Sequence, residues 1–160
     1  MINLKHVLVP TDFGEASEAA LTYGRTLART FGADLHLLHV MDNTFFRPMA
    51  SDPLSMKVAA YKQLNEKLSA ADRAELHART VVEVSDDPDA VIVDYAKAFR
   101  MDLIVMGTHG RQGAAHVLMG SVAERVVRTA PCPVLTVRES ERDFVMMKRE
   151  ASAERSTTLA

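Results

Sequence analysis

The chain has little cysteine, no long apolar run and no concentration of positive charge, and each shortage removes a class of protein. A single cysteine in 160 residues excludes an internal disulfide and any metal site built from several cysteines. No apolar segment reaches the ~20 residues that a membrane-spanning helix needs. The first five residues also lack the layout of a signal peptide. We therefore expect a cytoplasmic protein with no membrane partner.

The charges are balanced. Lys and Arg number 19 and Asp and Glu 21, which gives a formal net charge of −2 and a pI near 6.3. Because no long Lys/Arg cluster occurs, we expect no general binding to nucleic acid. The length fits one domain with a single core, at a size where a chain buries about 70% of its unfolded surface. Cys132, which lies between two prolines, is interpreted as a small buried hydrophobe rather than a reactive thiol.

Two nucleotide motifs and a catalytic pair are also missing from the sequence. Neither G-x4-G-K-[ST], the phosphate loop of P-loop NTPases, nor G-x-G-x-x-G, the dinucleotide-binding fingerprint, occurs. No general base paired with a nucleophile is evident, so we assign no catalytic residue and expect no efficient catalysis.

The most informative stretch is residues 102–121, DLIVMGTHGRQGAAHVLMGS. It begins with an unbroken apolar run, 103–106, which is typical of a strand covered on both faces of a parallel sheet. The loop that follows holds four glycines: Gly107, Gly110, Gly113 and Gly120. Apolar spacing after Ser121 predicts a helix with Gly120 or Ser121 as its N-cap. A strand, a loop and a helix start gather main-chain amides and the positive end of a helix dipole, which favours an anion such as phosphate.

Strands and helices alternate along the chain. The expected strands are 2–9, 33–40, 79–84, 103–106 and 133–137, and the expected helices are 15–31, 54–76, 87–100 and 121–129. We expect Pro10 to stop the first strand, Gly32 to end the first helix, 54–76 to be the longest helix and 41–53 to be a loop. Asp87, followed by Pro88, is expected to cap the third helix. This alternation predicts an α/β fold, a three-layer sandwich in which a five-stranded parallel sheet has helices on both faces.

The glycine spacing Gly107-x2-Gly110-x9-Gly120-Ser121 matches in full the nucleotide-binding signature G-x2-G-x9-G-[ST] of the universal stress protein family. Over residues 2–138 the chain resembles that family. Further similar runs are VPTD at 9–12, DLIVMGTHGR at 102–111 and PCPVLTV at 131–137. The resemblance implies an adenine nucleotide alpha hydrolase-like fold with strand order 3-2-1-4-5. That order reverses between the first and fourth strands, where ligands of open parallel sheets bind.

The resemblance implies an adenine nucleotide as ligand, ATP first and ADP or AMP as alternatives, with or without Mg²⁺. It implies these nucleotide-binding residues: Pro10, Thr11, Asp12, Val40, Met106, Gly107, His109, Gly110, Arg111, Gly120, Ser121 and Val122. The glycine amides would donate to phosphate, Asp12 would lie on the ribose and adenine side, and the backbone of Val40 would meet adenine. Arg111 could neutralise phosphate charge.

Structural alternatives stay open for each residue. The glycines could supply positive φ in turns, Asp12 could be an ordinary loop or capping carboxylate, and Arg111 could be solvated. His109 and His116 fit no dedicated metal site and are interpreted as loop residues. Two positions depart from the family pattern. Gly14 replaces a capping serine, which predicts a weak helix cap, and Asp86 replaces a glycine, which predicts local strain.

The leading hypothesis is a cytoplasmic, adenine-nucleotide-binding universal stress protein that acts as a nucleotide-dependent stress-response or regulatory module. The alternatives are a slow Mg²⁺-dependent ATP hydrolase or phosphoryl-transfer enzyme using Asp12 or His109, and a nucleotide-free dimeric scaffold. The last strand, Pro133 to Val137, would be an exposed apolar edge, and family members commonly pair such strands, so we expect a homodimer. Residues 1–138 form the expected domain, and 139–160 form a tail outside the family pattern.

Overall fold

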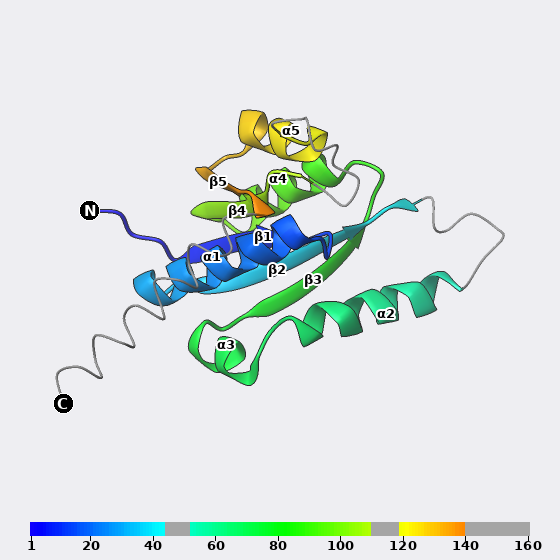
Figure 1. Cartoon of the computed structure of the whole chain (residues 1–160), viewed down its shortest axis with the longest axis horizontal. Coiled ribbons are helices and arrows are strands. Elements are labelled where there is room, and N and C mark those ends of the chain that lie inside the picture. The colour runs from blue at the N-terminus through cyan, green and yellow to red at the C-terminus, as the bar shows by residue number, and fades with distance from the viewer. Residues whose placement is uncertain (44–51, 110–118, 140–160) are drawn as a thin grey trace.

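The computed structural model describes residues 1–43, 52–109 and 119–139 of the chain. Its elements alternate as expected (Figure 1). The strands are β1 (His6–Pro10), β2 (Asp34–Met41), β3 (Arg79–Val84), β4 (Leu103–Gly107) and β5 (Val134–Val137). The helices are α1 (Glu15–Phe31), α2 (Pro53–Glu66), α3 (Ala70–Glu75), α4 (Pro88–Ala98) and α5 (Ser121–Thr129).

The five strands form one parallel sheet of order β3-β2-β1-β4-β5, which confirms the predicted topology. Side chains alternate between its faces, so β1 sends Val7 and Val9 to one face and Leu8 to the other. The first face carries the core beneath α1 and α2, and the second carries the core beneath α4 and α5 (Figure 1). The result is the predicted three-layer α/β sandwich.

Helix α1 lies close to the sheet because its inner face is built from small residues. Gly24 shows how close: a Cβ added there would lie 2.5 Å from Cγ2 of Val9. The helix ends at Gly32, whose φ of 65° is left-handed and favours glycine. Both helix bounds agree with the sequence prediction, whereas β1 begins later than expected and includes Pro10 as its last residue.

The single helix expected over 54–76 is wrong, because the chain breaks into α2 and α3. Ser69 begins α3 with a capping box in which its Oγ accepts from the Asp72 amide (3.0 Å) and the Asp72 carboxylate accepts from the Ser69 amide (2.9 Å). Asp72 is also tied to α1 by Arg25 and Arg29. Consequently α1, with 17 residues, is longer than α2, with 14.

Three expectations about local structure can be settled. Gly14 begins α1 without a side-chain cap, as predicted, and Ser17 Oγ donates to its carbonyl (2.8 Å). Asp86 is not among the described residues with positive φ, so the predicted strain is absent; its Oδ1 accepts from the Asn43 amide (3.0 Å). Asp87 precedes α4 but makes no capping hydrogen bond with its side chain, contrary to expectation.

Cys132 is half-buried against the core beneath α4 and α5, and burial raises the pKa of its thiol. This placement agrees with its interpretation as a small hydrophobe. Within the described ranges, no helix is both long and apolar enough to cross a membrane.

Candidate functional site

A pocket of about 390 Å³ opens at the carboxyl ends of the central strands. Residues at the ends of β1, β2 and β4 line it, together with the first turns of α4 and α5. β1 and β4 are neighbours in the sheet, and the chain leaves them toward opposite sides, so the pocket lies where the strand order reverses.

Ten of the twelve predicted site residues line this pocket: Pro10, Thr11, Asp12, Val40, Met106, Gly107, His109, Gly120, Ser121 and Val122. The other two, Gly110 and Arg111, lie outside the described residues. Six further lining residues were not predicted: Ser17, Leu38, Pro88, Ile92, Thr108 and Ala123. Thr108 and Ala123 stand beside predicted residues in the sequence and could have been included. Pro88 and Ile92 belong to α4, and no pattern in the sequence around them predicts that they line the pocket.

One wall of the pocket is apolar. Leu38, Ile92 and Met106 are buried members of the core beneath α4 and α5, and Val40 packs partly buried against it. Because these side chains also face the pocket, an entering ligand meets a continuous hydrocarbon surface. Such a wall can hold a flat, weakly polar ring.

The turn from β1 to α1 is held by its own hydrogen bonds. Thr11 Oγ1 accepts from the Phe13 amide (3.0 Å) and lies 3.0 Å from Ser17 Oγ, and the Thr11 amide donates to the Leu38 carbonyl (2.8 Å). Asp12 Oδ1 accepts from the Gly14 amide (2.9 Å). The Asp12 carboxylate therefore stabilises this turn, which agrees with the alternative that it is an ordinary loop carboxylate.

Phe13 in this turn has a left-handed φ of 64°, which a bulky residue rarely adopts. Its ring lies 4.4 Å, between centroids, from the ring of His39, whose Nδ1 is 2.8 Å from the Thr11 carbonyl oxygen. Unfavourable backbone conformations persist where the surroundings fix them, and they often do so at functional sites.

Gly107, at the end of β4, is required by packing against α1. A Cβ added to it would lie 2.8 Å from the Cβ and 2.9 Å from the carbonyl carbon of Ala16. The described glycine with positive φ is Gly32, so neither Gly107 nor Gly120 supplies a left-handed turn. The turn alternative is therefore wrong for both, and at Gly107 it is the start of α1 that occupies the space of a side chain.

Gly120, rather than Ser121, is the N-cap of α5, and it supplies no side-chain acceptor. Its amide donates to the Thr108 carbonyl (2.6 Å), so in this structure that amide is engaged by the backbone. The first intrahelical bond runs from the Glu124 amide to the Gly120 carbonyl (3.0 Å). The amides of residues 121–123, all of which line the pocket, precede that bond and are the donors that α5 leaves open.

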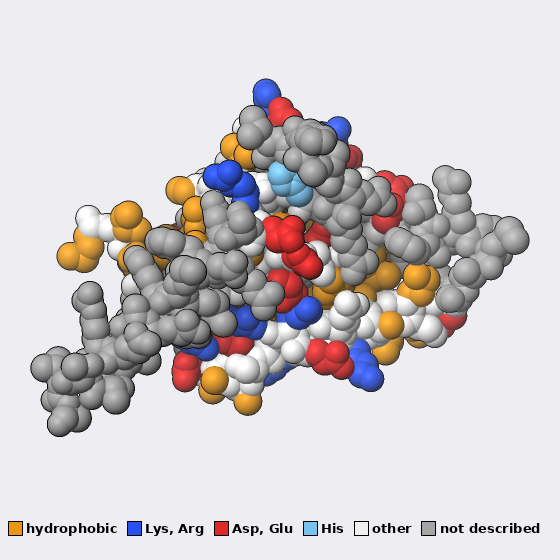
Figure 2. Space-filling view, viewed as in Figure 1, with side chains coloured by type: hydrophobic (Ala, Val, Ile, Leu, Met, Phe, Trp, Pro, Cys, Tyr) orange, Lys and Arg blue, Asp and Glu red, His pale blue; other side chains and the backbone are white. Residues whose placement is uncertain are grey.

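The charges around the pocket come mainly from the backbone. Among its described lining residues none is Lys or Arg, and Asp12 is the single carboxylate. Figure 2 shows acidic side chains gathered near the start of α1, whose first turn carries Glu15 and Glu18. A hydrogen bond with Glu15 raises the pKa of Glu139 there. The positive end of the α5 dipole is thus the main described attraction for an anion.

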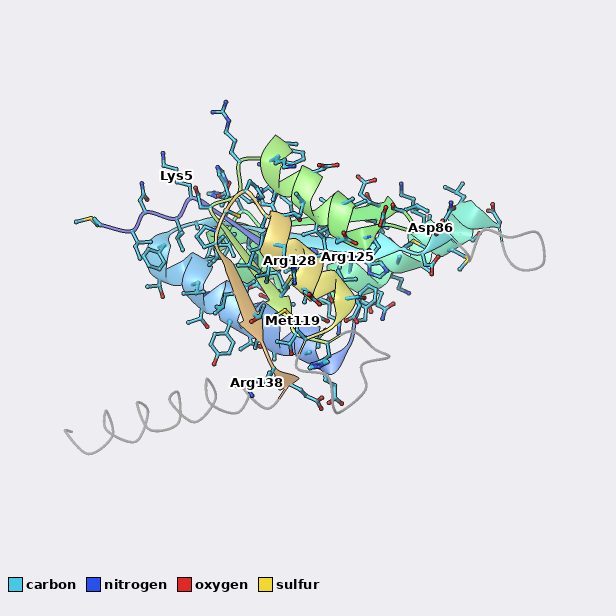
Figure 3. The ribbon with its side chains drawn as sticks, turned by 90° about the horizontal axis from the view of Figure 1, so that it is seen from above. Lys5, Asp86, Met119, Arg125, Arg128 and Arg138 are labelled. Atoms are coloured by element: carbon cyan, nitrogen blue, oxygen red, sulfur yellow. The ribbon has the colours of Figure 1, made fainter. Side chains whose placement is uncertain are left out.

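The arginines of α5 are engaged on its outer surface (Figure 3). Arg125 Nη1 lies 3.4 Å from Asp89 Oδ1, and Arg128 Nη2 lies 2.9 Å from Glu124 Oε1. His109, at the mouth of the glycine loop, has its Nδ1 2.9 Å from Thr108 Oγ1. These contacts leave the lining described above without a guanidinium or ammonium group.

A parallel sheet with helices on both faces and a pocket where the strand order reverses defines an open α/β protein, and comparison with known proteins gives the family. Residues 3–138 match the model of the universal stress protein family, so the chain belongs to that family. It is 30% identical over 147 residues to universal stress protein MJ0531 of Methanocaldococcus jannaschii, covering 87% of this chain and 85% of that one.

Solved structures agree with this assignment. The structure of MJ0577, a universal stress protein of the same organism, has 28% identity and a TM-score of 0.67, covering 86% of this chain and 97% of that one. A universal stress protein of Archaeoglobus fulgidus solved in complex with dAMP has 22% identity and a TM-score of 0.61, covering 86% and 99%; it shows the shared fold.

Proposed function

We propose that the pocket binds an adenine nucleotide, with ATP as the first candidate, and that the protein acts as a nucleotide-dependent stress-response or regulatory module. The observation that carries this proposal is the pairing, in one pocket, of an apolar wall with the open amides of residues 121–123. The apolar wall can pack against an adenine ring, and the open amides can donate hydrogen bonds to a phosphate group.

Each side of the pocket is assigned a part of the ligand. We assign adenine to the wall of Leu38, Val40 and Met106, and phosphate to the amides of residues 121–123 with the Ser121 hydroxyl. Asp12 is assigned to the ribose, because a carboxylate placed beside phosphates would repel them unless a cation intervened. The intact glycine signature supports this orientation, and a relative of the same fold holds dAMP.

Mg²⁺ fits the assigned site in one respect. Mg²⁺ in nucleotide sites is commonly bound by one or two carboxylates together with phosphate oxygens, and Asp12 offers one carboxylate. A slow hydrolase would use the same residues. Among the described lining residues, His109 Nδ1 lies 2.9 Å from Oγ1 of Thr108, but Thr108 is only 5% exposed, so its hydroxyl is poorly placed to attack a substrate. We therefore propose a binding protein rather than an efficient enzyme.

The proposal includes a cytoplasmic homodimer. β5 is an edge strand that pairs with β4, and Leu135 on it is 36% exposed. A second copy could cover this edge by strand pairing. Sedimentation of the full chain at micromolar concentration should give twice the monomer mass, and a monomer mass would remove the dimer without affecting the pocket.

The nucleotide proposal is tested first on the protein as purified. Denaturing it and assaying the supernatant should release adenine nucleotide, and calorimetric titration of nucleotide-free protein should give saturable binding of ATP with or without Mg²⁺. Failure of ATP, ADP and AMP to bind a folded protein would overturn the proposal. Sustained phosphate release with Mg²⁺ would instead favour the hydrolase.

A further inference from the structure

The amino ends of the strands carry a group of metal-ligand side chains, at the opposite edge of the sheet from the pocket. His6 of β1 and Asp34 of β2 are partners in register, and His36 lies two residues further along β2, so all three share one face. One potential ligand atom from each lies within 4.8 Å of the others. Figure 3 marks the two edges: Lys5 precedes β1 at one end, and Asp86 follows β3 at the other.

An imidazole nitrogen at this edge has no hydrogen-bond partner. His6 Nδ1 is shielded from solvent and makes no hydrogen bond with any described residue; Oδ2 of Asp34, 3.8 Å away, is too far for one. Buried polar atoms without partners are rare in native proteins and often mark the binding position of an ion or a water molecule. This orphaned nitrogen is the first indication of a ligand.

The backbone that carries the three side chains is held by surrounding groups. Asp102 Oδ2 accepts from the amides of Lys5 (2.8 Å) and His6 (2.9 Å), which fixes the start of β1. The Asp34 amide donates to the Lys5 carbonyl (2.8 Å), which fixes β2 beside it. Most of the ordering cost of a site is therefore already met by the fold.

Asp34 and His36 each use one polar atom in an outer contact and have another polar atom available. His77 Nδ1 lies 2.9 Å from Asp34 Oδ1, so Oδ2 is the oxygen nearer His6. Tyr95 Oη lies 2.8 Å from Nδ1 of the buried His36, which leaves Nε2 as the available nitrogen. Outer hydrogen bonds of this kind orient metal-binding histidines and carboxylates in known sites.

We propose that His6 Nδ1, Asp34 Oδ2 and His36 Nε2 bind a divalent transition-metal ion of the Zn²⁺ class, with a fourth position open to water. Two imidazoles and one carboxylate are a donor set suited to Zn²⁺. A tetrahedral Zn²⁺ site needs its ligand atoms about 3.4 Å apart, so the 3.8 Å from His6 to Asp34 closes with a small movement. The His6 side chain is 37% exposed, so its ring can rotate to bring the ligand atoms to this spacing.

One charge acts against this site. Arg79 of β3 is the register partner of His36, and its positive charge acts on that ring. The same guanidinium repels a cation. Replacing Arg79 should therefore strengthen metal binding, a change opposite in sign to that of every ligand substitution.

The test is calorimetric titration of the full-length chain, without a histidine tag, with Zn²⁺ alone. We expect one ion per chain. His6→Gln and Asp34→Asn should each weaken binding roughly tenfold or more, and Arg79→Gln should strengthen it. Zn²⁺ should also raise the melting temperature of the native chain but not that of His6→Gln.

His39→Gln is the matched control, because His39 lies on β2 with its side chain on the other face of the sheet. It should leave Zn²⁺ affinity unchanged. Since His36 is buried and bonded to Tyr95, His36→Gln could unfold the protein, so the test depends on the more exposed His6. Absence of saturable Zn²⁺ binding, or binding that survives both His6→Gln and Asp34→Asn, would overturn the proposal.

Discussion

Two polar regions of this protein differ in what their hydrogen-bonding groups contact. Beneath α1, the Asp72 network (Arg25, Arg29, Ser69 and Asp72) is closed: the buried carboxylate accepts from Arg25 Nε (3.0 Å), Arg29 Nη2 (2.8 Å) and the Ser69 amide (2.9 Å). At the pocket, the first amides of α5 have no capping side chain from Gly120. Closed groups hold elements together, and open groups are available to a ligand.

Mutations in the two regions should therefore have different effects. Changes in the closed network should lower stability and leave nucleotide binding intact. Changes at the open amides should lower binding and leave stability intact. Gly107, which borders both the pocket and α1, is the intermediate case.

The largest effect is expected from Asp72→Asn. The amide is nearly isosteric but cannot pair with two guanidinium groups, and Asp72 is 2% exposed. Because Arg25 and Arg29 keep partial access to solvent, we expect a loss of about 2 to 3 kcal/mol in the free energy of unfolding, at the low end for a broken buried ion pair. Urea denaturation measures it. An unchanged midpoint would show that the network does not hold α3 to α1.

The next effect is expected from Gly107→Ala. The added methyl group meets the backbone of Ala16, which can move only with α1, so we expect a loss of about 1 to 3 kcal/mol. Gly24→Ala is the matched comparison, since its Cβ would meet a side-chain methyl of Val9 rather than backbone. If the Gly107→Ala protein is as stable as the native chain but binds nucleotide more weakly, Gly107 serves ligand binding rather than packing against α1.

A smaller effect, confined to binding, is expected from Ser121→Pro. Proline is accepted in the first turn of a helix, and Gly120 has the extended ψ of 158° that a residue before proline prefers. The substitution removes one amide donor and keeps α5. If the proposed phosphate site is correct, ATP affinity should fall about tenfold or more, as for a hydrogen bond to a charged group.

Ser121→Ala is the control for this change, because it removes the hydroxyl and keeps the amide. Circular dichroism verifies that both variants retain their helix content. Equal ATP affinity in the proline and alanine variants would exclude the Ser121 amide from phosphate binding.

The local features of this structure could be predicted from the sequence, whereas the contacts between distant segments could not. The bounds of α1 follow from apolar spacing and Gly32, and the family resemblance led to most of the pocket. The break at Ser69 was hidden because apolar residues continue at helical spacing into Leu68. Its stabilising pairs join Asp72 to residues 43 and 47 positions away, a relation that no spacing along the chain reveals.

The same limit applies at the site. The motif assigns the amide of Gly120 to phosphate, and in the structure this amide donates to the Thr108 carbonyl, a contact that the motif does not predict. The motif also does not show that the Cβ space of Gly107 is occupied by Ala16, a residue far away along the chain. A motif predicts which residues gather, and the fold decides which of their polar groups remain open.

The smallest expected effect is on the pH dependence of stability. Burial alone would raise the pKa of Asp72, but the hydrogen bond from the Ser69 amide and the charge of Arg25 outweigh it and hold the pKa below its ordinary value of 3.8. A carboxyl with a lowered folded pKa contributes stability above its unfolded pKa and loses it as the pH falls through the folded value. The native chain should therefore lose its advantage over Asp72→Asn below about pH 4. Urea midpoints of both proteins between pH 7 and pH 3 measure this, and a constant difference would mean that the carboxylate charge is not what the two arginines stabilise.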